Sequence, residues 1–259
     1  IPSIGLEGGG PTMWWGSIPP DQRPMDENSL VYDSEVLIEP IEILGRPIAN
    51  LHVSADAKRA NWVVRVSDIA PDGQVTQVAG AAFNGTHRNS SREPEDIIPG
   101  EKFLLNIELH FTSWIFNEGH RIRVAISNAQ WPMLWPSSLP VNTSLEIGGE
   151  GTYINLPIMP SGKIETPNFK EPRANPTLRG YEVLDAGNIT GYAAISSIQN
   201  DPNTGEKFGL ATNSGATKYP WGVERYEEEI EHRTYDNNPA NTTVLGRYKI
   251  TEELKDRTL

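Results

Sequence analysis

The sequence predicts an all-β protein: an antiparallel β-sandwich, in the form of a jelly roll, with an extended C-terminal appendage. Three observations carry this prediction. Apolar and polar residues alternate with a period of two in several stretches, as expected of half-buried strands. Turn-forming residues are frequent, with 23 glycines and 21 prolines among 259 residues. No helical pattern separates the strands of residues 1–160, and short strands at such spacing are typical of a sandwich.

The first clear strand lies in residues 62–69. Trp62, Val64 and Val66 are apolar, whereas the intervening positions 65 and 67 are polar, so one face should be buried and the other solvated. The following Pro-Asp-Gly of residues 71–73 favours a hairpin turn, because proline fixes φ and glycine accepts a positive φ.

Three further stretches extend the sheet pattern. Residues 103–111 place one set of apolar side chains on a single face: Phe103, Leu105, Ile107, Leu109 and Phe111. Residues 117–120 then predict a turn into a strand with the apolar face Ile122, Val124 and Ile126. Residues 145–147 and 153–156 predict a short hairpin around the glycine-rich residues 148–151. These faces should pack together as the core.

The pattern changes at about Ser161, so we divide the chain into a sandwich (1–160) and an extended arm with an additional β-rich region (161–259). Four prolines interrupt a polar stretch after residue 159, which is typical of a linker or arm. Weak strands are expected at 181–198 and 208–217, separated by a turn at 200–205. For residues 224–231 the sequence leaves a helical turn and an edge strand both open.

Composition excludes several classes of protein. There are 34 acidic and 22 basic residues, a net charge of −12, which argues against nucleic acid and against an anionic membrane surface as partners. There is no cysteine, and no apolar run approaches the ~18 residues of a membrane span. The first residue is Ile1, with no leader after it, so we expect a trimmed N-terminus and leave the cellular compartment open.

Residues with catalytic or ligand chemistry are sparse. No Gly-x-Ser-x-Gly sequence is present to expose a nucleophilic serine. The five histidines have no metal-ligand spacing, and we interpret them as structural or solvated. Residues 201–206 resemble the start of a calcium loop, but loop position 12 would be Thr212 where a glutamate is needed, so a plain turn is the better interpretation. We therefore expect no metal and no cofactor.

Four segments in order and spacing carry a family resemblance. The first is Asp21-Gln22-Arg23-Pro24, which follows a glycine-rich turn and the loop Met13-Trp14-Trp15. The others are Asn61–Val75, Pro99–Arg123 with its Gly-His-Arg-Ile-Arg sequence, and Ile126–Pro132. Together they resemble the C-terminal, non-catalytic β-domain of the X-prolyl dipeptidyl-peptidase, cocaine esterase (CocE/NonD) and α-amino-acid ester hydrolase group. The resemblance covers residues 1–160.

The resemblance implies a galactose-binding-like jelly roll that follows an α/β-hydrolase domain with a Ser–Asp–His triad. The chain itself lacks the nucleophile, so we expect it to be inactive alone. Its expected role is that of an accessory domain covering one side of the catalytic cleft of an esterase or X-Pro peptidase. The expected partners are the upstream hydrolase domain and, as a second option, further copies in a homo-oligomer. In this family His120 and Arg121 would pin a turn.

Two aromatic loops are the candidate site. Trp14 and Trp15 are adjacent, so they cannot both point to the same side of a strand. Met13, Trp14 and Trp15 either pack under the neighbouring loop or the tail, or they reach the hydrolase domain and wall the substrate pocket. Trp131 and Trp135, each followed by a proline (Pro132 and Pro136), leave the same alternatives open. A rival function is a carbohydrate-binding module, which would present its tryptophans on an open platform.

Overall fold

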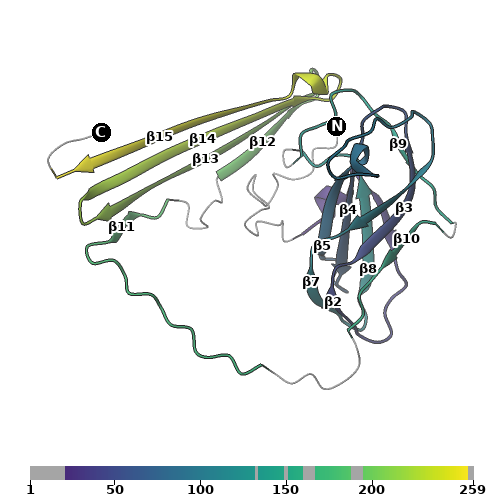
Figure 1. The fold of residues 1–259 in the computed structure, drawn as a ribbon, viewed down its shortest axis with the longest axis horizontal. Helices are drawn as coiled ribbons and strands as arrows, with labels where there is room; N and C mark the ends of the chain where they lie inside the picture. The colour runs from purple at the N-terminus through teal and green to yellow at the C-terminus, as the bar shows by residue number, and fades with distance from the viewer. Residues whose placement is uncertain (1–20, 132–133, 149–150, 160–166, 188–194, 256–259) are drawn as a thin grey trace.

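In the computed structural model, residues 21–131, 134–148, 151–159, 167–187 and 195–255 are described. They form a β-sandwich and a second, longer sheet that extends from one end of it (Figure 1). All the strand pairs are antiparallel. The prediction of an all-β, antiparallel sandwich is confirmed, whereas its jelly-roll connectivity stays a prediction.

Two main sheets build the sandwich. The first has the order β1 (Leu30–Asp33), β8 (Arg121–Ser127), β4 (Asn61–Ile69) and β5 (Val75–Asn84). The second has the order β10 (Tyr153–Asn155), β3 (Ile48–Ala55) and β6 (Phe103–Glu108), with β9 (Thr143–Leu145) also on β3. A separate ribbon pairs β2 (Ile41–Gly45) with β7 (Thr112–Phe116). Single helical turns lie at α1 (Arg23–Asp26), η2 (Gly85–His87) and η3 (Pro239–Asn241).

The core lies between these sheets. The alternating residues of three strands meet there, as the sequence predicts: Trp62, Val64 and Val66 of β4, Leu105 and Ile107 of β6, and Ile126 of β8 are buried, with Phe103, Ile122 and Val124 packed against them. Leu109 joins the same core just beyond β6. Register therefore follows the apolar face of each strand, because a slip by one residue would turn every such side chain outward.

Three details of the sequence-based interpretation are wrong. Phe111 is exposed, because β6 ends at Glu108 and the alternation does not continue to residue 111. Residues 145–147 and 153–156 do not form a hairpin, since β9 and β10 each pair with β3 at different positions. The polar face of β4 is not solvated: Arg65 and Ser67 are buried, because α1 covers that side of the sheet.

Turn chemistry follows the sequence closely. The Pro-Asp-Gly turn joins β4 to β5, with Gly73 at φ 87°. At the turn of residues 201–206, the Asp201 carboxylate accepts hydrogen bonds from the Asn203 backbone N–H (2.9 Å) and the Thr204 hydroxyl (2.9 Å). Both carboxylate oxygens thus serve the turn itself, as expected of an Asx turn.

The C-terminal region forms one long sheet. Its order is β11 (Glu182–Asp185), β13 (Glu206–Tyr219), β14 (Gly222–Tyr235) and β15 (Thr243–Leu254), and β12 (Ile195–Asp201) also pairs with β13. The strand expected at 181–198 is divided between β11 and β12. Residues 224–231, for which a helical turn and an edge strand were open, lie in β14 and pair on both sides. The strand interpretation is therefore correct, but the strand lies inside the sheet and not at its edge.

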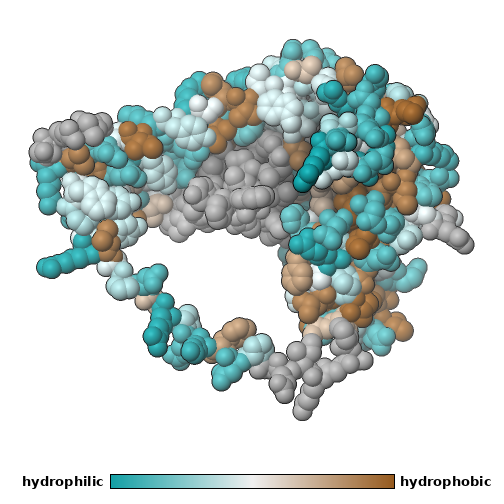
Figure 2. All heavy atoms as spheres, in the orientation of Figure 1, coloured by the Kyte–Doolittle hydropathy of each residue, from teal (hydrophilic) through white to brown (hydrophobic). Residues whose placement is uncertain are grey.

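The exposed residues 167–180 lead to this sheet as an extended segment that lies to the left of the sandwich and below the long sheet in Figure 1. In Figure 2 the same segment is mostly hydrophilic. Within the part of the chain that the structure describes, no helix is long and apolar enough to cross a membrane.

Candidate interface site

The site begins where the chain enters the sandwich, at α1. The Gln22 backbone N–H donates to the Val75 carbonyl (2.8 Å), which fixes the helical turn on β5. The side chain of Met25, a residue of this turn, is buried. Asp21 accepts from the backbone N–H (3.1 Å) and Nε (2.8 Å) of Arg23, and these hydrogen bonds lower the pKa of Asp21. The Asp21–Arg23 pair thus lies at the surface where the chain enters α1, and Pro24 lies in the first turn of the helix, where a missing N–H costs little.

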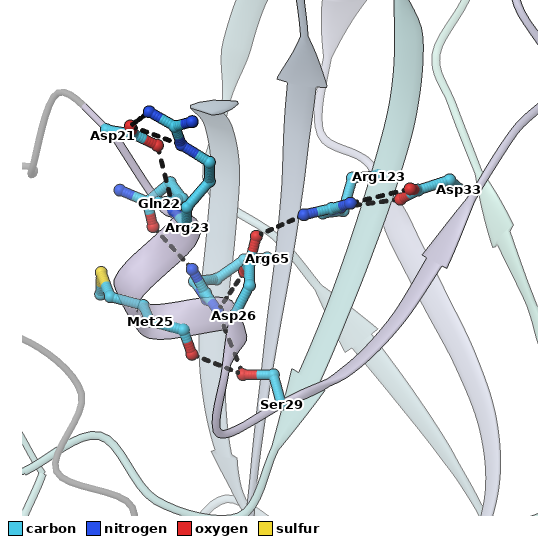
Figure 3. Close-up of polar contacts among 9 residues, drawn as sticks. All are labelled: Asp21, Gln22, Arg23, Met25, Asp26, Ser29, Asp33, Arg65 and Arg123. Carbon is cyan, nitrogen blue, oxygen red and sulfur yellow. Dashed lines mark hydrogen bonds and ion pairs between the residues drawn. The ribbon is translucent and has the colours of Figure 1, made fainter. Parts of the chain in front are cut away.

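Arg65 is the centre of the site, with only 1% of its surface exposed. Its Nη1 donates to Gln22 Oε1 (2.7 Å), and its Nη2 donates to Asp26 Oδ1 (2.8 Å) and Ser29 Oγ (3.1 Å). Figure 3 shows the guanidinium on β4 reaching toward these groups on and beside α1. Burial lowers the pKa of Arg65, and the Asp26 carboxylate opposes that effect.

Arg123, on the adjacent strand β8, continues the network. Its Nη1 donates to Asp26 Oδ2 (3.0 Å), and Nε and Nη2 bind the two oxygens of Asp33 (2.7 and 2.8 Å). This fork-like pairing lowers the pKa of Asp33 and raises that of Arg123. Two guanidinium groups therefore face two carboxylates, which balances the charge in a mostly buried position.

The network has a structural consequence. It ties α1, β1, β4 and β8 together, and a buried ionic group tolerates little displacement, because losing a partner exposes the full desolvation cost. The edge strand β1 and the segment before it are thereby held in one position on the first sheet. We call this set of residues, Gln22, Asp26, Asp33, Arg65 and Arg123, the arginine mount.

A second polar cluster fixes the turn before β8. Asp68 accepts from Trp114 Nε1 (3.0 Å) and lies 2.8 Å from His120 Nδ1. The turn itself has Gly119 at φ 84°. A His–Asp pair is also part of serine-hydrolase chemistry, which in addition needs a nucleophile beside the histidine. Neighbouring Ser67 points to the opposite face of β4, so it does not supply one.

An exposed apolar edge adjoins the arginine mount. The strand β1 lies at the edge of the first sheet, and its residues Leu30, Val31 and Tyr32 are all exposed. Two hollows lie beside it. One of about 310 Å³ lies between residues 27–30 and residues 143–145, and one of about 290 Å³ lies between Tyr32 and residues 147, 148 and 152–154. The second is lined mainly by apolar side chains.

The residues proposed from sequence fall in different places. Met13, Trp14 and Trp15 lie outside the described residues. Trp131 is 1% exposed, whereas Trp135 is 59% exposed. Trp131 packs edge-on against His232 of β14, with ring centroids 6.2 Å apart, so it joins the sandwich to the C-terminal sheet. Burial lowers the pKa of His232. The loop of Trp135 begins at Asn128 and leads to Thr143, and both residues line the larger hollow.

Sequence reasoning missed the arginine mount. Arg65 stands at a polar position of an alternating strand, a pattern that predicts exposure. The sequence does show an acidic residue, Asp26, shortly after the Asp-Gln-Arg-Pro sequence. No local sequence pattern, however, links Asp26 to Arg65, which lies 39 residues further along the chain. Among the described residues, no group of three or more histidine or acidic side chains could hold a metal ion.

Comparisons with known proteins agree with this architecture. Residues 9–150, more than half of the chain, match the family model of the X-Pro dipeptidyl-peptidase C-terminal non-catalytic domain. The chain is 33% identical over 116 residues to cocaine esterase from Rhodococcus sp. (strain MB1 Bresler), covering 44% of this chain and 20% of that protein. It is 28% identical over 127 residues to a serine esterase from Mycobacterium bovis, covering 42% of this chain and 20% of the esterase. The chain thus spans about a fifth of the length of these relatives.

Solved structures show the same fold. An α-amino acid ester hydrolase aligns with a TM-score of 0.52 and 24% identity, covering 57% of this chain and 28% of that one. An aminopeptidase from the marine sediment archaeon Thaumarchaeota archaeon aligns with a TM-score of 0.54 and 24% identity, covering 62% of this chain and 30% of that one.

The fold and the match define the protein class as a β-sandwich accessory domain of the kind found in CocE/NonD-type hydrolases. The chain belongs to the family of X-Pro dipeptidyl-peptidase C-terminal non-catalytic domains.

Proposed function

We propose that this domain covers one side of the catalytic cleft of an α/β-hydrolase-type serine hydrolase that acts on esters or X-Pro peptides. The observation that carries the proposal is the exposed apolar edge of β1, with its two hollows, held in place by the arginine mount. Exposed apolar patches next to recesses are typical of surfaces that receive another protein domain.

The position of the arginine mount supports this partner. Residues that precede Asp21 are covalently joined to α1, which rests on the same sheet as β1. A hydrolase domain on the N-terminal side would therefore be connected to the sandwich close to this edge. The mount would keep the edge in one orientation toward it, which catalysis requires of any group that shapes a substrate pocket.

Trp135 is the described residue best placed to contribute a wall. It is exposed, while both ends of its loop line the hollow beside β1. A large aromatic side chain left in solvent is costly unless another surface covers it. We propose that Trp135, together with Met13, Trp14 and Trp15 of the N-terminal aromatic loop, contacts the hydrolase domain or its substrate. Trp131 would instead act indirectly, by fixing the start of the loop.

Replacing Trp135 with alanine in the full-length hydrolase tests this proposal. We expect kcat/KM to fall by about tenfold, which corresponds to ~1.4 kcal/mol of transition-state stabilisation. The melting temperature should stay unchanged, because the ring is mostly exposed within this domain. The matched control is Trp221→Ala, since Trp221 is similarly exposed but lies between β13 and β14 at the hairpin end of the long sheet. An unchanged kcat/KM for Trp135→Ala would refute the role of this loop in the cleft.

A further inference from the structure

We propose that β15 pairs antiparallel with β15 of a second copy of this chain, so that two C-terminal sheets become one continuous sheet across a two-fold axis. Among the described residues, β15 is the terminal strand of its sheet, and it pairs with β14 over its whole length without a register shift. It contains no proline, and most of its residues are exposed. A long, regular and open edge is suited to pairing with another strand.

The hairpin between β13 and β14 shows which backbone groups of β15 face outward. Tyr219 and Gly222 close this two-residue hairpin, so the two residues form backbone hydrogen bonds with each other. In an antiparallel ladder, hydrogen-bonded pairs alternate with pairs that are not hydrogen-bonded, so every second pair along β13 and β14 is hydrogen-bonded. The even-numbered residues of β14 therefore bond to β13, and the odd-numbered ones bond to β15. Glu229 of β14 is paired with Arg247 of β15, so the odd-numbered residues of β15 form the backbone hydrogen bonds to β14. Its even residues, from Val244 to Glu252, direct their N–H groups outward.

This geometry limits the registers of a symmetric pair. The even-numbered residues of one copy must form hydrogen-bonded pairs with even-numbered residues of the other copy. In a symmetric pair this is possible only if the two-fold axis passes through a residue position, so that this residue lies opposite itself in the other copy. An axis at Lys249 would place two lysines opposite each other. An axis at Tyr248 would place Arg247 opposite Lys249. Both arrangements bring like charges together, which destabilises a strand pair.

An axis at Ile250 removes these conflicts. It places Arg247 opposite Glu253 of the other copy, twice by symmetry, and Lys249 opposite Thr251. Charges on an edge strand normally oppose association. Here the basic residues of β15, Arg247 and Lys249, precede its acidic residues, Glu252 and Glu253, and that order makes the strand complementary to itself when it runs antiparallel.

The apolar side chains of β15 agree with the same register. Tyr248 is 68% exposed and Ile250 is 67% exposed. With the axis at Ile250, the two isoleucines oppose each other, and each Tyr248 lies diagonally beside the Ile250 of the other copy. Cross-strand contacts of this kind, between aromatic and β-branched residues, stabilise antiparallel pairs. The proposal needs no contribution from the hydrolase domain.

The molar mass of the chain in solution tests the proposal. Analytical ultracentrifugation at micromolar concentrations should give about twice the 28.7 kDa of one chain. Ile250→Pro removes one outward N–H and no bond to β14, so it should give a monomer. Glu253→Lys brings a lysine opposite Arg247 and should raise the dissociation constant at least about tenfold at low salt. The control Glu252→Lys makes the same charge change on the other face and should have a smaller effect. A second control, Arg225→Ala, removes the ion pair that Glu253 forms within its own chain and should leave the dimer intact.

Far-UV circular dichroism and thermal melting decide whether each variant is folded. If Ile250→Pro disrupts the sheet, the comparison of Glu253→Lys with Glu252→Lys carries the test, because neither change alters the backbone. A monomeric wild-type chain would overturn the proposal. A dimer that persists equally in Ile250→Pro and Glu253→Lys would also overturn it, since another surface would then hold the two copies.

Discussion

Replacing Asp26 with alanine is expected to lower the free energy of unfolding by about 3–5 kcal/mol, as found when one partner of a buried ion pair is removed. Asp26 accepts from both Arg65 and Arg123. Without it, the Arg65 guanidinium keeps only neutral partners in a position closed to water. Urea denaturation of the purified chain measures the change, and a shift of this size is a large part of the stability of an ordinary domain.

Asp21→Ala is the matched control, because it breaks an aspartate–arginine pair in the same short segment. That pair is exposed, and surface pairs contribute little. The urea midpoint should therefore stay close to that of the wild type. If Asp26→Ala and Asp21→Ala shift the midpoint equally, the arginine mount does not hold this end of the sandwich together.

Ile107→Asp is expected to abolish soluble folding. Ile107 is 1% exposed and lies in the core between the two sheets. An aspartate there would bury a carboxylate with no partner, or would take up a proton at a comparable cost. The yield of soluble protein and the thermal transition measure the effect.

The control for this prediction lies on the same strand. Leu104 is 53% exposed on the opposite face of β6, so Leu104→Asp should give soluble protein with a cooperative transition. If both variants lose soluble protein to a similar degree, then β6 tolerates no charge on either face, and the orientation of its side chains does not explain the result. A soluble, cooperatively folded Ile107→Asp protein would show that β6 is misplaced.

The sequence predicted the sandwich well because its strands have one apolar face each. In residues 103–109 the alternation alone separates core from surface, and the structure follows it. The same rule failed at Arg65, where the covering element is a single helical turn from a distant part of the chain. Periodicity describes one strand at a time and contains no information about what lies above it.

The C-terminal sheet was harder to predict for a related reason. Its long strands have charged side chains on one face, where Glu227, Glu229 and Glu231 of β14 form ion pairs with Arg247 and Lys249 of β15. A run of glutamates resembles a solvated helix or loop when read alone. It becomes a strand because the next strand supplies the opposite charge at matching positions, a pairing that only the register defines.

The candidate interface could be predicted only in part. The exposed Trp135 agrees with the proposed contact surface, whereas Trp131 is buried against His232 within the chain. Two tryptophans in one proline-flanked loop look equivalent in sequence. The difference between them arises from the C-terminal sheet, which covers one of them.

Labelling with a fluorophosphonate serine probe tests the central claim, that this domain serves a hydrolase without contributing its nucleophile. The full-length hydrolase should take up one probe molecule per active site and is the positive control. The chain of 259 residues alone should show no stoichiometric labelling, because acyl transfer needs an activated nucleophile beside a base. Labelling of a single serine in this chain, lost when the protein is denatured, would contradict the account.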